Sequence, residues 1–344
     1  MKSTITKALF AGTSALAVAA LLTACSGGGS SSGSASSGSQ ATMPAQMTSI
    51  TLALNPAAQM APVYYGIEQG IFTKHNLDVS IVPQTDVAAI VSGVASGQYT
   101  FGFATVVHDI NANLNNIQIR AVATPDGQQD PNEKPDVGNA LVAGPGSGIT
   151  SAGQLAGKTL CVIGLSSLNT LAAYAMAADD GVSNPKESIQ LVQLPFGQMP
   201  QALSSKQCDA AVIQSPFIAQ AEAIGGTIIG KPNVQIFSNE AIGLFNTMQS
   251  YIDQHPDVVK AFVDAVVESQ EAAKANIPAA QQTLVSNLNI TPEQAAQSFW
   301  GTADPYVNTA GFATAQDLLM KYAGQTTELD VDTLVWPGGL EPGK

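Results

Sequence analysis

The chain has 344 residues and a formal net charge of −13, with 11% charged residues and a single arginine, Arg120. So acidic a surface repels nucleic acid, and no basic cluster in the sequence offsets it, so nucleic-acid binding is excluded. The body of the chain, about 300 residues, is longer than one hydrophobic core usually serves, and we therefore expect two lobes.

The first 47 residues carry a targeting pattern. Lys2 and Lys7 precede an apolar run over residues 8–22, which is the order of a secretory signal and is too short to span a bilayer. The Leu-Thr-Ala sequence before Cys25 resembles the lipobox of bacterial lipoproteins, in which the signal is cut before a cysteine that is then lipid-modified. We expect a signal peptide over residues 1–24, then a lipidated Cys25 and a flexible Ser/Gly-rich linker over 25–47. The alternative is an ordinary secretory signal with an incidental cysteine.

Strands alternate with helices along the body. The expected strands cover residues 49–54, 79–82, 100–104, 119–123, 140–143, 158–163, 189–192 and 210–213. Beyond residue 237 the pattern changes to helices, expected at 256–274, 278–287, 292–300 and 313–322. This alternation is typical of βαβ units and predicts an α/β fold of two mainly parallel sheets with a helical C-terminal tail.

Two cysteines remain in the body. Cys161 lies in an apolar run and Cys208 directly precedes another, so neighbouring strands would bring the two sulfurs within bonding distance in an oxidising compartment. Two buried free thiols are the equal alternative. The sequence has no paired-cysteine motif and only three histidines, so neither a metal site nor a cofactor is expected.

Five segments, in order, resemble one family. Residues 62–72 and 75–79 are similar to the opening of the nitrate/sulfonate/taurine-type solute-binding proteins, and the similarity continues through 96–104, 147–158 and 202–217. It extends over about residues 48–325. The resemblance implies a bilobal type II periplasmic-binding fold, with residues 48–138 and 239–344 in lobe 1 and residues 139–238 in lobe 2. The two crossovers between the lobes are expected near residues 139–143 and 236–238.

The resemblance also implies a function. These proteins are extracytoplasmic receptors of ABC importers and capture a small organic molecule or anion, such as a sulfonate, nitrate, a pyrimidine or an aromatic acid. The implied partners are the ligand and a permease–ATPase complex. The protein itself is expected to be a monomer that is attached to the membrane by its lipid alone. A membrane-tethered sensor lipoprotein without a transport role is the alternative. An enzyme on the same fold is a remote alternative, because the cysteine cluster of the related thiamine-pyrimidine synthase is absent. No catalytic residues are expected.

The predicted ligand site follows from fold geometry. Ligands of α/β sheets bind beyond the carboxyl ends of the strands, where helix N-termini present free amides. Reading these strand ends gives Asn55, Gln84, Thr85, Ala104 and Thr105 in lobe 1, and Ser166, Ser167, Asn169, Thr170, Phe196 and Gln214 in lobe 2. The hydroxyl residues among them could instead serve only as helix caps. Ser215 stands where relatives often carry an acid, Tyr64 and Phe103 are expected in the core, and His108 with Asp109 is expected to be a solvated pair.

Overall fold

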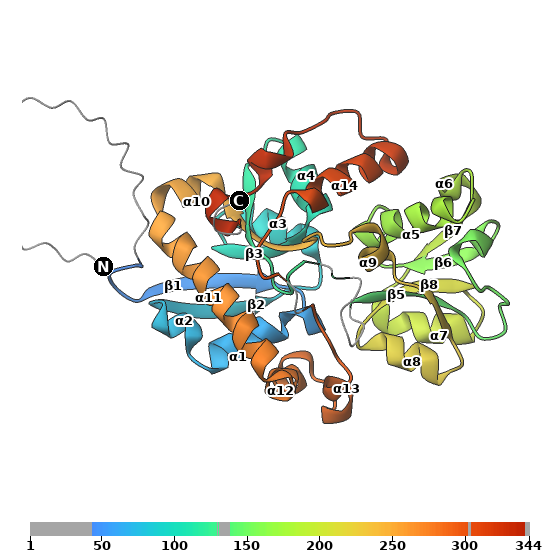
Figure 1. Ribbon diagram of the computed structural model, residues 1–344, viewed down its shortest axis with the longest axis horizontal. Helices are drawn as coiled ribbons and strands as arrows, with labels where there is room; N and C mark the ends of the chain where they lie inside the picture. The colour runs from blue at the N-terminus through green and yellow to red at the C-terminus, as the bar shows by residue number, and fades with distance from the viewer. Residues whose placement is uncertain (1–42, 129, 131–137, 302–303, 341–344) are drawn as a thin grey trace, which may run out of the picture. The chain divides into compact units, whose positions relative to one another are not determined.

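The computed structural model describes residues 43–128, 130, 138–301 and 304–340, and the strands of these residues form two five-stranded sheets (Figure 1). Sheet A has the order β2-β1-β3-β10-β4 and sheet B the order β7-β6-β8-β5-β9. The strands of sheet A are β1 (Thr48–Leu54), β2 (Leu77–Pro83), β3 (Phe101–Thr105), β4 (Ile119–Ala123) and β10 (Gly243–Met248). Those of sheet B are β5 (Asn139–Ala143), β6 (Thr159–Val162), β7 (Gln190–Gln193), β8 (Ala210–Gln214) and β9 (Thr227–Gly230).

Each sheet contains one strand that runs against the others. β10 is antiparallel to both β3 and β4, and β5 is antiparallel to both β8 and β9, whereas β1 pairs in parallel with β2 and β3, and β6 with β7 and β8. The predicted α/β class is therefore confirmed, with both sheets mixed. The sequence prediction did not include β9 or β10. Residues 140–143, expected as a strand close to one of the crossovers, belong to strand β5, which pairs on both sides within sheet B.

Helices cover both faces of sheet A. They are α1 (Ala61–Glu68), α2 (Ile71–Lys74), α3 (Val87–Ala95), α4 (Val106–Leu114), α10 (Gln249–Gln254), α11 (Pro256–Ala275), α12 (Ile277–Leu288), α13 (Pro292–Ala296) and α14 (Ala310–Leu318). Alternate residues of a strand point to opposite faces, so Leu52 packs in the cluster with α1 and α11, and Ala53 packs against α3. Phe262 of α11 stacks on Phe101 of β3 with ring centroids 3.9 Å apart. Tyr64 is buried in the same cluster, as expected.

Sheet B is built in the same way. Its helices are α5 (Leu168–Asp179), α6 (Pro185–Ser188), α7 (Met199–Ser204), α8 (Phe217–Ala223) and α9 (Pro232–Ile236). Leu160 and Val162 of β6 pack in the cluster that contains α5, whereas Cys161 between them packs against α7 on the other face. Cys161 and Cys208 form a disulfide with their Cα atoms 5.8 Å apart. The bond ties β6 to the segment that enters β8, its neighbour in the sheet.

The chain passes between the sheets twice. It leaves sheet A after β4 and enters sheet B at β5, and it returns through residues 237–242, which connect α9 to β10. The boundaries of the two lobes stay a prediction. Residues 1–42 lie outside the described residues, so the signal peptide and the lipidation of Cys25 also stay predictions. Within the described part of the chain, no helix is long and apolar enough to cross a membrane.

Candidate functional site

The strand register brings the sheet A candidates to one edge. Leu54 at the end of β1 pairs with Pro83 at the end of β2, and Ala53 pairs with Gly102 in β3. Residues that directly follow these pairs therefore lie side by side at what we call the carboxyl edge of sheet A. Asn55 and Gln84 are such residues, and Thr105 closes β3 beside the first residue of β10.

The two threonines of this edge have different surroundings. Thr85 is exposed and is not the cap of α3, because Asp86 occupies the N-cap position and accepts a hydrogen bond from the Ala88 amide at 2.9 Å. Thr105 is the N-cap residue of α4 but makes no capping hydrogen bond with its side chain. Its Oγ1 lies 2.9 Å from Nδ1 of His108 instead. Neither hydroxyl therefore serves as a side-chain cap.

The other three sheet A candidates present different groups. Asn55 has a buried Oδ1 with no hydrogen-bond partner among the described residues, so an acceptor is left at this edge. Gln84 donates from Nε2 to the Tyr99 hydroxyl at 3.1 Å. Ala104 is fully buried in the apolar cluster between β3, α3 and α4, so its side chain belongs to the core.

On sheet B, two predicted residues build the turn between β6 and α5. Ser167 is the N-cap of α5 and accepts from the Thr170 amide at 3.3 Å. Thr170 is buried and donates its hydroxyl hydrogen to the Gly164 carbonyl at 2.7 Å. Both hydroxyls thus hold the turn, whereas Ser166 beside them is exposed.

A chain of side-chain amides joins the remaining candidates. Asn139, the first residue of β5, is buried. Its side chain donates to Oδ1 of Asn169 at 3.1 Å and accepts from the backbone N–H of Asn233 at 3.2 Å. Its register partner on β8 is Gln214. Gln214 donates from Nε2 to Oε1 of Gln59 at 2.9 Å, and Gln59 belongs to the turn that follows β1. This hydrogen bond joins the carboxyl edges of the two sheets directly.

Phe196 begins the turn after β7. It is partly buried against the cluster of α7, β6 and β8, so one part of the ring packs in the lobe and the rest remains accessible. This placement suits an aromatic wall better than a core position would.

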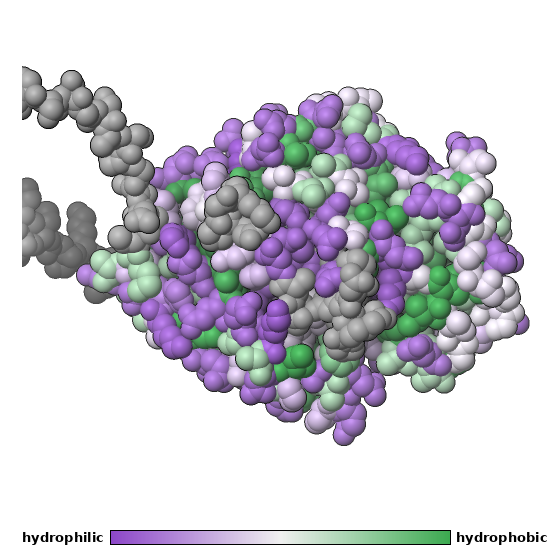
Figure 2. All heavy atoms as spheres, in the orientation of Figure 1, coloured by the Kyte–Doolittle hydropathy of each residue, from purple (hydrophilic) through white to green (hydrophobic). Residues whose placement is uncertain are grey.

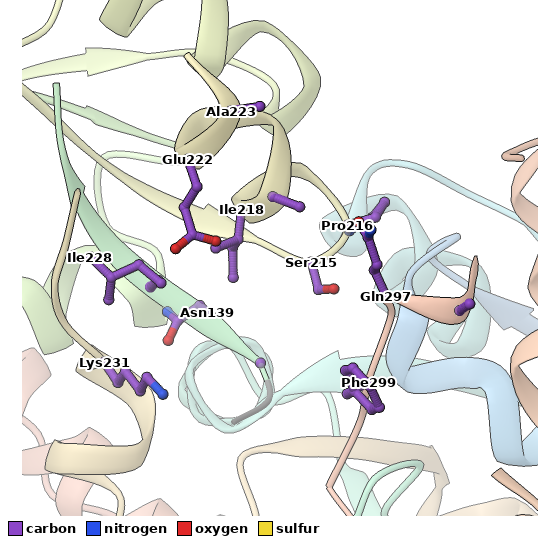
Figure 3. Close-up of a pocket in the computed structure, with 14 residues that line it drawn as sticks. Asn139, Ser215, Pro216, Ile218, Glu222, Ala223, Ile228, Lys231, Gln297 and Phe299 are labelled. Carbon is purple, nitrogen blue, oxygen red and sulfur yellow. The ribbon is translucent and has the colours of Figure 1, made fainter. Parts of the chain in front are cut away.

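A cavity of about 730 Å³ adjoins these residues on the β5 side of sheet B. This volume is within the range of small-molecule sites, and the lining is mainly apolar with a few polar groups, as such sites usually are. Figure 3 shows Glu222 of α8 and Lys231 across an open space from Gln297 and Phe299, which follow α13. Asn139 and Ser215 line the cavity as well, so it continues from the edge at which Gln214 lies.

Burial controls the titrating groups beside the site. Burial lowers the pKa of His108, with nearby Asp86 acting in the opposite direction, so the neutral imidazole is favoured. Asp109 is completely buried, and burial raises the pKa of its carboxyl well above the usual range. The expectation of a solvated His108–Asp109 pair is therefore wrong: the first turn of α4 places Asp109 inside the lobe, where Asn246 of β10 donates to it at 3.0 Å.

The single arginine lies away from this edge. Arg120 is at the amino end of β4, where it donates to Oδ1 of Asn113 at 2.8 Å and to the Ile119 carbonyl at 2.9 Å. Charged side chains of the described residues at the site include Asp86, Glu222 and Lys231, and Oδ1 of Asp126 lies 3.5 Å from the position of a Cβ on Gly243, the register partner of Thr105. The site therefore offers mostly neutral amides and hydroxyls, together with the N-termini of α3, α4 and α5.

Figure 2 shows apolar residues in separate patches among hydrophilic ones. Leu165, in the turn that carries Ser166, is 54% exposed, the highest fraction among the large apolar side chains of the described residues. Single exposed apolar residues of this kind are normal on protein surfaces. Among the described residues, no group of three or more His, Cys, Asp or Glu side chains is placed to hold a metal ion.

Comparison with known proteins identifies the family. A family model described as "NMT1/THI5 like" matches residues 57–280, more than half of the chain. The chain belongs to the NMT1/THI5-like family. A search of curated protein sequences finds no match.

Solved structures similar to this member of the NMT1/THI5-like family share the periplasmic solute-binding fold. The alkanesulfonate-binding protein SsuA from Xanthomonas axonopodis pv. citri, bound to MOPS, has a TM-score of 0.69 at 12% identity, over 85% of this chain and 99% of that one. The ligand-binding component of an ABC-type import system from Staphylococcus aureus has a TM-score of 0.68 at 15% identity, over 86% and 99%. The nitrate-binding protein NrtA from Synechocystis PCC 6803 has a TM-score of 0.66 at 13% identity, over 83% and 84%. At these identities the likeness establishes the fold.

Sequence reasoning missed Asn139, Glu222 and Lys231, for two different reasons. It collected the last residues of strands, but an antiparallel strand brings its first residue to the carboxyl edge of its neighbours. Asn139 opens β5 in this way. Glu222 and Lys231 had no signal in the sequence, because they line the cavity through α8 and the segment after β9, which was not predicted as a strand.

Proposed function

We propose that this protein is an extracytoplasmic solute-binding receptor of an ABC importer, which captures a small polar organic molecule or anion between the carboxyl edges of its two sheets. Family membership and the periplasmic solute-binding fold support this proposal. The observation that carries it is the Gln214–Gln59 hydrogen bond of 2.9 Å, which joins the edge of one sheet to the edge of the other next to a cavity of about 730 Å³.

The residues of the two edges suit such a ligand. The buried Oδ1 of Asn55 would accept from a donor group, and the amides at the start of α3, α4 and α5 would donate to an oxygen or an anionic group. Phe196 would stack against an apolar or aromatic part of the ligand. The hydroxyls of Ser167 and Thr170 hold the turn before α5, whereas neither the Thr85 nor the Thr105 side chain caps its helix, so we assign the larger part of ligand contact to Thr85 and Thr105.

We also propose that the receptor is a lipoprotein anchored through Cys25 and acts as a monomer beside a permease–ATPase complex. The Leu-Thr-Ala-Cys sequence and the Ser/Gly-rich residues after it support the anchor. Such a tether would hold the binding body at the outer face of the membrane while it exchanges ligand with the permease.

A thermal-shift screen tests the proposal. The protein without residues 1–24 and with Cys25→Ala would be heated with alkanesulfonates, taurine, nitrate, pyrimidines and aromatic acids. A ligand present at a hundred times its dissociation constant adds about 2.7 kcal/mol of stability, which raises the melting temperature by about 5 °C for a domain of this size. At least one class should give such a shift, and a panel without any shift at millimolar concentration would contradict the receptor assignment.

A further inference from the structure

The connection from sheet B back to sheet A is fastened to the C-terminal part of the chain. Residues 237–242 run from α9, which packs on α5 of the sheet B side, to β10 of sheet A. Asn308, two residues before α14, accepts from the Ala241 amide at 3.3 Å and donates to the Asn239 carbonyl at 2.9 Å. One side-chain amide thereby pairs both a donor and an acceptor of the connection.

Two residues of α14 complete this contact. Thr314 donates its hydroxyl hydrogen to Oε1 of Glu240 at 2.9 Å. Gly311 approaches the connection so closely that an added Cβ would lie 2.3 Å from the Ala241 carbonyl oxygen. Phe237 and Ala241 are fully buried in the apolar cluster that also contains Phe312. Residues 308–314 therefore contact residues 239–241 of the connection by hydrogen bonds and by close packing.

The same C-terminal part contacts both sides of the molecule. α14 packs on α4 of the sheet A side and also meets α5 of the sheet B side. Beyond α14, the ring of Tyr322 lies 5.6 Å, centroid to centroid, from the ring of Tyr174 in α5. Any rotation of sheet B against sheet A has to change these contacts and the backbone angles of residues 237–242, because hinges absorb motion in a few connecting residues.

We propose that residues 308–314 form a clamp on the connection 237–242 and set the equilibrium between the arrangement of the two sheets seen here and a second arrangement. The clamp stabilises the arrangement in this structure, and it does so from outside the ligand site. Each hydrogen bond of the clamp shifts the equilibrium by about 2- to 13-fold, the ratio that corresponds to the net worth of a protein hydrogen bond. The consequence for ligand affinity rests on the proposed function, but the equilibrium itself exists without ligand.

The test measures the distance between the sheets in the full chain without ligand. Spin labels would be attached at Gln254→Cys of α10 and Glu187→Cys of α6, two exposed positions, in a Cys25→Ser background. Pulsed electron–electron double resonance then gives the distribution of distances between the two labels. The clamp variants are Asn308→Ala, which removes both amide contacts, and the conservative Thr314→Val, which removes the bond to Glu240. Both should add or enlarge a second distance population, Asn308→Ala more than Thr314→Val.

Gln316→Ala is the matched control. Gln316 lies on α14, as Thr314 does, and its side-chain amide makes two hydrogen bonds, as that of Asn308 does. Both bonds of Gln316 go to the backbone of Leu329 in the C-terminal tail, at 2.7 and 3.3 Å, and not to the connection. This variant should lower the melting temperature and leave the distance distribution as in the wild type. Unchanged distributions in both clamp variants, or an equal change in Gln316→Ala, would overturn the clamp. If the distance distributions change in the clamp variants but no ligand is found in the screen, the receptor assignment is refuted and the clamp stands.

Discussion

Replacing Asp109 with asparagine should stabilise the protein, and more so as the pH rises. The carboxyl is fully buried, accepts one hydrogen bond from Nδ2 of Asn246 at 3.0 Å, and has a second oxygen without a hydrogen-bond partner among the described residues. Because burial raises its pKa, the folded protein keeps the proton at pH values at which the unfolded chain has lost it. The buried carboxyl therefore lowers the free energy of unfolding of the wild type. This loss begins near the unfolded pKa of about 3.9 and grows by at most about 1.4 kcal/mol per pH unit until the folded pKa is reached.

Asparagine has nearly the same shape, is neutral at every pH, and can donate to Oδ1 of Asn246, which also has no partner among the described residues. The free energy of unfolding of Asp109→Asn should therefore match that of the wild type near pH 4 and exceed it increasingly toward pH 7. Asp109→Ala is the control: it should show the same pH trend, but offset downward by about 1–3 kcal/mol because the amide of Asn246 loses its partner.

Urea unfolding at constant ionic strength, followed by tryptophan fluorescence from pH 4 to 8, measures this difference. Both tryptophans of the chain, Trp300 and Trp336, pack in the apolar cluster of sheet A, so the signal reports on the lobe that contains Asp109. A constant difference between Asp109→Asn and the wild type across this range would refute the reasoning, because it would mean that the buried carboxyl has the same pKa as in the unfolded chain.

Three further outcomes are expected. Cys25→Ala should abolish labelling by radioactive palmitate, and unchanged labelling would contradict the lipoprotein assignment. Intact mass spectrometry of the unreduced protein should give a mass two hydrogen atoms below that of the reduced chain, since Cys161 and Cys208 are bonded; two thiols that alkylate without reduction would exclude the bridge. Ser167→Ala should lower stability by about 0.5–2 kcal/mol through loss of the α5 cap while ligand affinity changes less than twofold, and a large affinity loss at unchanged stability would return this residue to the ligand site.

The sequence predicted the α/β class well because the parallel strands of both sheets are short apolar runs. Runs such as that around Leu160 are recognisable without any tertiary information. β10 was not recognisable, because its buried positions include Asn246 and Thr247, which are polar. Nδ2 of Asn246 donates to Asp109 of α4, and Thr247 donates to the Thr100 carbonyl at 2.7 Å, so only the tertiary fold explains why these residues are tolerated in a buried strand.

The candidate site was predictable in outline and less so in the roles of its residues. Strand ends located the two carboxyl edges, but sequence alone could not separate Thr85, whose neighbour Asp86 is the cap, from Ser167, which is itself the cap. The distinction depends on which side chain reaches the first amides of the helix, a matter of one residue in the turn. Similarly, the contact between Gln59 and Gln214 joins residues far apart in the sequence, and no local pattern marks it.

The most direct test of the central claim is calorimetry of Thr85→Ala and Thr105→Ala with the compound that the screen identifies. Thr48→Ala is the matched control, because Thr48 begins β1 at the opposite end of sheet A and its hydroxyl bonds, among the described residues, only the nearby Gln46 carbonyl. If the ligand binds between the carboxyl edges, at least one of the two site variants should bind about five- to a hundredfold more weakly, the cost of one lost hydrogen bond to the ligand, while Thr48→Ala binds like the wild type. Wild-type affinity in both site variants would contradict the placement of the ligand at this edge.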